Sequence, residues 1–106
     1  MKMKNDLSQP RQQLIDVMQQ TNYGRIEGLK VHDGEPVFYP FPNVVQHVMF
    51  GKKNGPNELR GSDFVLKQKV AEMFEMFDRK STFCIQELYI ENGLPVKMTI
   101  KNLVQV

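Results

Sequence analysis

Few side chains in this 106-residue sequence combine the types and spacing that catalysis or metal binding needs. His32 and His47 are the only histidines and Cys84 the only cysteine, and they form neither a His-x₃-His nor a Cys-x₂-Cys pattern. A zinc site built on them would need carboxylates brought from elsewhere in the fold. We therefore expect no metal and no cofactor, with His32 in a turn and His47 in a strand.

Cys84 lies between Phe83 and Ile85, at the start of an expected strand. A cysteine nucleophile acts as a thiolate, which a nearby base or positive charge must stabilise. No histidine adjoins it in the sequence. We expect a buried thiol that packs as a small hydrophobe, and a nucleophile is the alternative.

Acidic side chains gather on or near two expected hairpins: Glu27, Asp33, Glu35, Glu87 and Glu91. A suitably held pair of carboxylates can act as general acid and base. Spacing within a strand gives no reason to pair any two of these residues, so we expect solvated positions. No catalytic residue is assigned, and an enzyme is not the expected class.

The basic side chains are unevenly distributed, although the net charge of +2 is too small to indicate a polyanion partner. They gather near the N-terminus at Lys2, Lys4 and Arg11, and within residues 51–61 at Lys52, Lys53 and Arg60. Residues 51–61 contain three glycines and one proline, which predict an irregular loop. Two interpretations stay open: a solvated linker, or weak nucleic-acid binding through the tail and this loop.

Tyr39, Phe41 and Tyr89 would offer stacking surfaces to single-stranded nucleic acid if they were exposed together. The aromatic-basic consensus of the RNA recognition motif is missing, and the order of elements differs. We therefore expect edge and core aromatics.

The chain contains the same pattern of apolar and turn residues twice, at an offset of 59 positions (85 minus 26). Ile26, Leu29, Gly34, Pro36, Val37, Asn43, Val45 and Gln46 recur as Ile85, Leu88, Gly93, Pro95, Val96, Asn102, Val104 and Gln105. Almost no polar side chain recurs, so the repeat is structural. It predicts one domain, 1–106, with a pseudo-repeat of residues 8–50 and 62–106 joined by the loop 51–61.

Each repeat predicts a helix followed by a hairpin. The first helix covers residues 8–21, with Ser8 as N-cap and with Asn22 or Gly24 at its end. A strand over 25–32 then alternates, with Ile26 and Gly28 on the face opposite Leu29. Asp33-Gly34 favours a tight type I′ turn, and Asn92-Gly93 repeats it.

The returning strand of the first repeat is interrupted by Pro40 and Pro42, which an edge strand tolerates. Its counterpart over 95–105 has no such interruption. The second helix covers residues from 62 or 63 to 79. We predict an α+β fold of order αββαββ, an antiparallel sheet with two helices on one face.

The segments Tyr23-Gly24-Arg25-Ile26-Glu27 and Asp33-Gly34-Glu35-Pro36-Val37 resemble short bacterial proteins of unknown function. Those proteins have a helix, a Tyr-Gly-x-Ile-Glu-like start and a glycine-turned hairpin. The second repeat departs from this pattern, with Thr82 and Phe83 in place of Tyr-Gly. The resemblance implies a fold unit and transfers no catalytic residue.

The second helix has more apolar side chains than a single stripe accommodates, among them Met73, Phe74, Met76 and Phe77. We expect a cytoplasmic, non-enzymatic interaction or regulatory module that forms a homodimer, with Phe74 or Met76 in the interface. A wide core stripe would explain the same residues. The alternatives are weak nucleic-acid binding, or a small-ligand-binding protein or enzyme with a pocket beside this helix.

Overall fold

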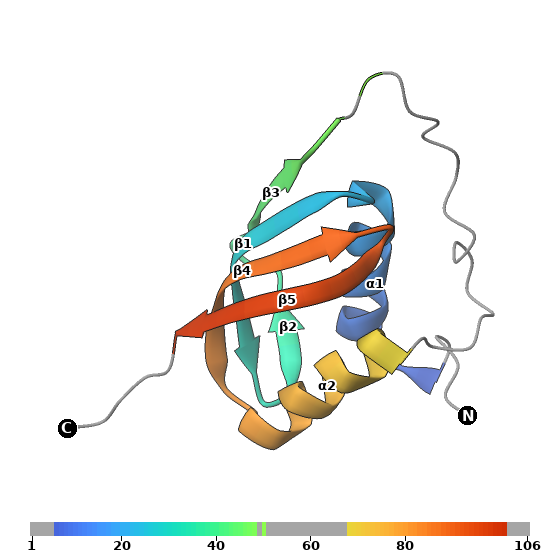
Figure 1. Ribbon diagram of the computed structural model, residues 1–106. Helices are drawn as coiled ribbons and strands as arrows, with labels where there is room; N and C mark the ends of the chain where they lie inside the picture. Colours follow the sequence, from blue (N-terminus) through green and yellow to red (C-terminus); the bar gives the residue numbers. More distant parts are fainter. Residues whose placement is uncertain (1–5, 49, 51–67, 102–106) are drawn as a thin grey trace.

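The structure is a computed structural model that describes residues 6–48, 50 and 68–101. It contains two helices and five strands (Figure 1). In chain order they are α1 (Gln9–Thr21), β1 (Gly24–His32), β2 (Glu35–Val37), β3 (Asn43–Gln46), α2 (Gln68–Lys80), β4 (Phe83–Glu91) and β5 (Leu94–Lys101).

The strands form one antiparallel sheet in which β1 and β4 are the central pair. β5 pairs with β4, and β2 and β3 both pair with β1. Since β4 occupies one side of β1, the two short strands share its other side. The α+β class and the antiparallel sheet are confirmed.

The returning strand of the first half is broken in two, so the order is αβββαββ and not αββαββ. β2 places Val37 opposite Lys30, and β3 places Asn43 opposite Glu27. Residues 38–42 between them contain Pro40 and Pro42, which cannot donate to the ladder. The predicted interruption and its edge position are confirmed, and β5 runs unbroken to Lys101.

The two halves of the chain resemble each other in the length of their first strand and in the conformation of their hairpin turn. β1 and β4 have nine residues each, and each follows a helix. Asp33 and Asn92 have φ of 54°, and each precedes a glycine of positive φ, as the predicted hairpin turns require. The superposition of residues 8–50 on 62–106 stays a prediction, because residues 51–67 and 102–106 lie outside the described residues.

Each hairpin turn is hydrogen-bonded to the end of the helix in the other half. The Gly34 amide donates to the carbonyl of Ser81 at 2.7 Å, and the Gly93 amide donates to the carbonyl of Asn22 at 2.9 Å. Asn22 is the predicted C-cap of α1. These two bonds join the halves at both ends of the sheet.

The start of α1 has the N-cap that the sequence predicts. Ser8 is the N-cap, and its side chain accepts a hydrogen bond from the Arg11 amide. Pro10 occupies the first turn, where a missing N–H is harmless. The predicted start of the second helix, over 62–67, lies outside the described residues.

Both helices cover the same face of the sheet, because their apolar side chains belong to a single core with those of β1 and β4. In Figure 1 these strands lie in front of α1, and α2 crosses below them. The alternation predicted for residues 25–32 is wrong at Ile26, which is fully buried together with Leu29. Gly28 has a φ of +74° and interrupts the pairing of β1 with β4, so the strand changes face there.

Arg11 is the one buried basic side chain among the described residues, with 9% of its surface exposed. Its guanidinium donates to the Gly34 carbonyl at 2.8 and 3.2 Å and to Asp78 at 2.5 Å. It also pairs with Glu35 at 3.2 Å and lies 5.1 Å from the centre of the Phe74 ring. Arg11 therefore joins α1, the β1–β2 turn and α2 at one point.

We expect Arg11→Met to lower the free energy of unfolding by about 2–3 kcal/mol, since it leaves the buried Gly34 carbonyl without its donor. Urea unfolding measures the change. Arg79→Met is the matched control, because the Arg79–Glu75 pair is about 70% exposed on both sides and should contribute less than about 0.5 kcal/mol. Equal effects of the two variants would contradict this role for Arg11.

Candidate functional site

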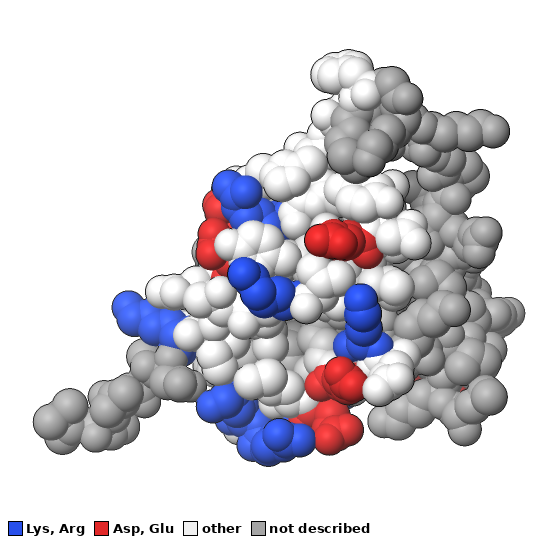
Figure 2. Space-filling model, viewed as in Figure 1, with Lys and Arg blue, Asp and Glu red and all other residues white. Residues whose placement is uncertain are grey.

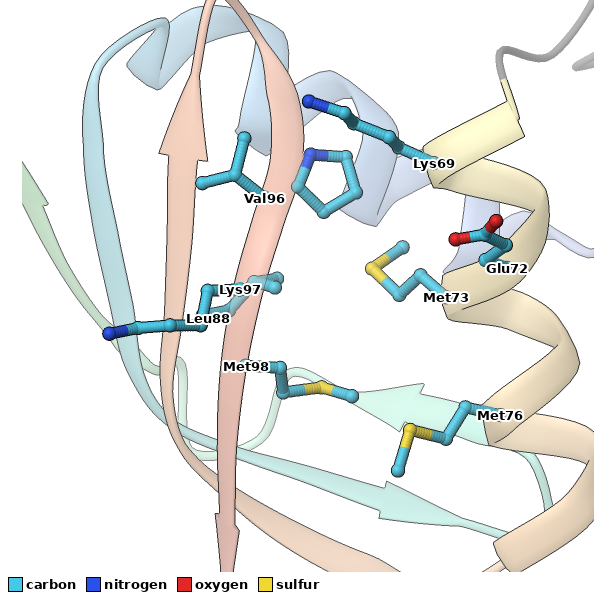
Figure 3. A pocket seen from close by; sticks show the side chains of 9 residues that line it. Lys69, Glu72, Met73, Met76, Leu88, Val96, Lys97 and Met98 are labelled. Carbon is cyan, nitrogen blue, oxygen red and sulfur yellow. The ribbon is translucent and has the colours of Figure 1, made fainter.

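A groove between α2 and β5 is the first candidate site (Figure 3). Its volume is about 290 Å³. The residues that line it are Lys69, Glu72, Met73, Met76, Leu88, Pro95, Val96, Lys97 and Met98. Met73 and Met76 point from the helix toward the strand, and Met98 points back toward the helix. The groove is apolar at its floor, and its charged residues lie along the helix side and the strand.

The side chains of this groove differ in what they offer to a partner. Met76 and Met98 are half-buried, and Val96, which lies at a register shift of β5 against β4, is 38% exposed. Phe74 is only 4% exposed, with its ring edge-on to Phe77 at 5.4 Å. Phe74 therefore has little surface to offer a partner, because the core of the same chain surrounds it, and its place in an interface stays a prediction. Of the two proposed interface residues, Met76 offers surface.

The open edge of β5 adjoins the groove. β5 pairs with β4 on one side, and no described strand pairs with its other side. An unpaired edge presents a row of N–H and C=O groups that can accept a further strand. The groove and this edge together form what we call the α2–β5 surface.

The opposite face of the sheet brings together two carboxylates whose spacing in the chain gives no reason to pair them. Glu27 on β1 is directly opposite Glu87 on β4. Arg25 lies between them, 2.6 Å from Glu27 and 3.9 Å from Glu87. The Asn43 amide donates to Glu27 at 2.8 Å. Only the register of β1 against β4 reveals this pair, and the helix-hairpin pattern does not specify that register.

The charges of this face compensate one another, because Arg25 lies between the two carboxylates. The hydrogen bonds from Arg25 and then from Asn43 lower the pKa of Glu27. Glu27 therefore stays ionised at neutral pH and is unsuited to act as a general acid. Figure 2, which views the strands from the side opposite α1, shows acidic and basic side chains interspersed with uncharged surface.

Tyr89 completes this cluster. Its hydroxyl donates to Glu87 at 2.8 Å, and the Lys97 ammonium lies 4.8 Å from the centre of its ring. Tyr39 is 91% exposed at the far end of the sheet, beyond Val37. Because Tyr89 is opposite Arg25 and Val37 is opposite Lys30, the rings do not form one stacking surface.

The other residues that the sequence suggested for catalysis, metal binding or nucleic-acid binding do not come together in a site within the described part of the chain. Cys84 is half-buried and paired in register with Lys30 and Lys101, so its expected full burial was wrong. Within residues 6–48, 50 and 68–101, no three His, Cys, Asp or Glu side chains gather closely enough to hold a metal ion. Lys52, Lys53 and Arg60 lie outside the described residues.

Comparison of the chain with protein-family models, with curated proteins and with solved structures finds no match. The resemblance to short bacterial proteins stays a prediction. Neither α1 nor α2, as far as the structure describes them, has the length and apolar character needed to cross a membrane.

The pKa of Tyr89 is raised, first by its hydrogen bond to Glu87, then by partial burial and by the charge of Glu87. A raised pKa in the folded state means that this group stabilises the fold below the ordinary value of about 10 and loses that contribution as the pH rises above it. An alkaline titration of tyrosine absorbance should show a component, from Tyr89, that ionises above the ordinary pKa of about 10. Glu87→Gln should lower the pH at which Tyr89 ionises, and Tyr89→Phe should remove this ionisation from the titration. A late tyrosine that persists in Tyr89→Phe would contradict the assignment.

Proposed function

We propose that this protein is a small, non-enzymatic interaction module that self-associates through the α2–β5 surface. The observation that supports this most is the continuity of an apolar, methionine-lined groove with an unpaired strand edge. A second chain added to the β5 edge places its side chains over Met76, Met98 and Val96. Methionine side chains adapt to the surfaces they meet, which suits such a contact.

The charges around the groove favour a second copy of this chain over a partner whose surface is uniformly acidic or uniformly basic. Lys69 and Glu72 both line it from α2 and are exposed. A two-fold interface sets the same patch against itself, so a patch with both signs can pair Lys69 of one copy with Glu72 of the other. A strongly acidic or basic partner would meet a like charge at one of the two residues.

The other edge of the sheet is poorly suited to the same contact. β2 and β3 have three and four residues, and residues 38–42 with two prolines separate them. Natural sheets block an edge with short strands and prolines. β5 has eight residues. Pro95 and a register shift against β4 restrict the start of its edge, and Lys97 and Lys101 are its charged blocking groups, so the longest uninterrupted stretch is residues 97–101. We therefore place the contact at β5.

The compartment that we propose is the cytosol, because a sequence with the single cysteine Cys84 cannot form an intramolecular disulfide and fits a reducing environment.

We expect Met76→Asp to weaken dimerisation at least about 100-fold, because it places a charge in a desolvated contact. Met76→Leu, which keeps the volume, should change it less than about tenfold. Sedimentation velocity over a concentration series measures both, and thermal melts check that each variant is folded. A wild type that stays monomeric at about 300 μM would reject the dimer.

A charge reversal separates a two-fold contact from any other use of the groove. Lys69→Glu alone should weaken the dimer about tenfold or more, since it sets a new carboxylate against Glu72 of the other copy. Adding Glu72→Lys should restore it, because each pair then has opposite signs again. Dimerisation that responds equally to the single and the double variant would show that the two residues do not meet across the interface.

A further inference from the structure

We infer that a second hollow, on the opposite face of the sheet, is a binding site for a small organic cation such as an alkylammonium group. Its volume is about 310 Å³, and it is lined by Tyr23, Gly24, His47, Tyr89, Ile90 and Glu91. The inference does not depend on the proposed dimer, because none of these residues lines the α2–β5 groove.

The backbone fixes the shape of this hollow. Gly24 is opposite Gln46 on β3 and opposite Ile90 on β4, so three strands meet here. A Cβ at Gly24 would overlap the Val45 carbonyl oxygen, which shows how closely β3 approaches β1. The His47 amide donates to the Tyr23 carbonyl at 2.7 Å and continues this pairing by one residue. The lining side chains therefore project from a hydrogen-bonded frame.

The chemistry of the lining favours a positive ligand. Two of its six residues, Tyr23 and Tyr89, have phenol rings, and His47 adds an imidazole. Glu91 is the only carboxylate, and the lining contains no lysine or arginine. An aromatic face attracts an ammonium group, most strongly when a carboxylate lies nearby and water is partly excluded. A volume near 310 Å³ is at the small end for ligand pockets, which suits a compact cation.

Two basic side chains near the hollow, Arg25 and Lys97, already have partners. Arg25 pairs with Glu27 at 2.6 Å and lies 3.9 Å from Glu87. The Lys97 ammonium lies 4.8 Å from the centre of the Tyr89 ring, which shows that this ring attracts a cation. A ligand therefore has to use the other face of the ring or displace Lys97. The Tyr89 hydroxyl donates to Glu87, which adds electron density to the ring. Glu91, in contrast, is exposed at the end of β4 and has no ion pair within the described residues.

The test compares choline with its neutral carbon analogue, dimethylbutanol, in amide NMR titrations of the full chain. Choline should shift the amides of Gly24, Ile90 and Glu91 with a dissociation constant in the millimolar range. Dimethylbutanol has the same shape without the charge, and should bind at least about five-fold more weakly, the effect of a unit charge about 4 Å away in water. Equal binding of the two probes, or no shift with choline, would overturn the inference.

A pair of variants tests whether the Glu91 carboxylate is the group that attracts the cation. Glu91→Gln should weaken choline binding about five-fold and leave dimethylbutanol binding unchanged. Glu75→Gln, which removes a carboxylate from the exposed side of α2, should leave both unchanged. Choline binding that is unaffected by Glu91→Gln would also overturn the inference, and the probe comparison in the unaltered protein decides it if that variant fails to fold.

Discussion

The guanidinium of Arg11 holds the start of α1, the β1–β2 turn and the end of α2 at one buried point. A helix and a hairpin of this size are marginal alone, because neither buries enough apolar surface. The carbonyl of Gly34 needs a donor inside the protein, and Arg11 supplies it while its charge is met by Asp78 and Glu35. The two amide bonds from Gly34 to Ser81 and from Gly93 to Asn22 then close the halves on each other.

The position of α2 follows from this constraint and creates the α2–β5 surface. Asp78 fixes the last turn of α2 near the hairpin of the first half, and Phe74 and Phe77 enter the core beside it. The helix then runs along β5 with Met73 and Met76 toward the strand, and a groove stays open between them (Figure 3). The interrupted edge at β2 and β3 leaves β5 as the one long edge among the described strands.

The features that depend on neighbouring residues could be predicted from the sequence, whereas those that depend on contacts between distant segments could not. The Ser8 cap, the Asp33-Gly34 and Asn92-Gly93 turns and the break at Pro40 depend on neighbouring residues, so the sequence shows them. The burial of Ile26, the pairing of Glu27 with Glu87 and the role of Arg11 depend on how β1 meets β4 and how α1 meets α2. Arg11 belonged to a basic tail in the sequence, and no spacing within the chain points to its partner Asp78.

Hydrogen exchange of the unaltered protein at low and high concentration tests most directly whether the α2–β5 surface is where two copies meet. If it is, the amides of β5 and of the Met73–Met76 turn gain protection as the concentration rises, while those of β2 and β3 do not change. Protection that is independent of concentration, or that increases at β2 and β3 instead, would contradict the account.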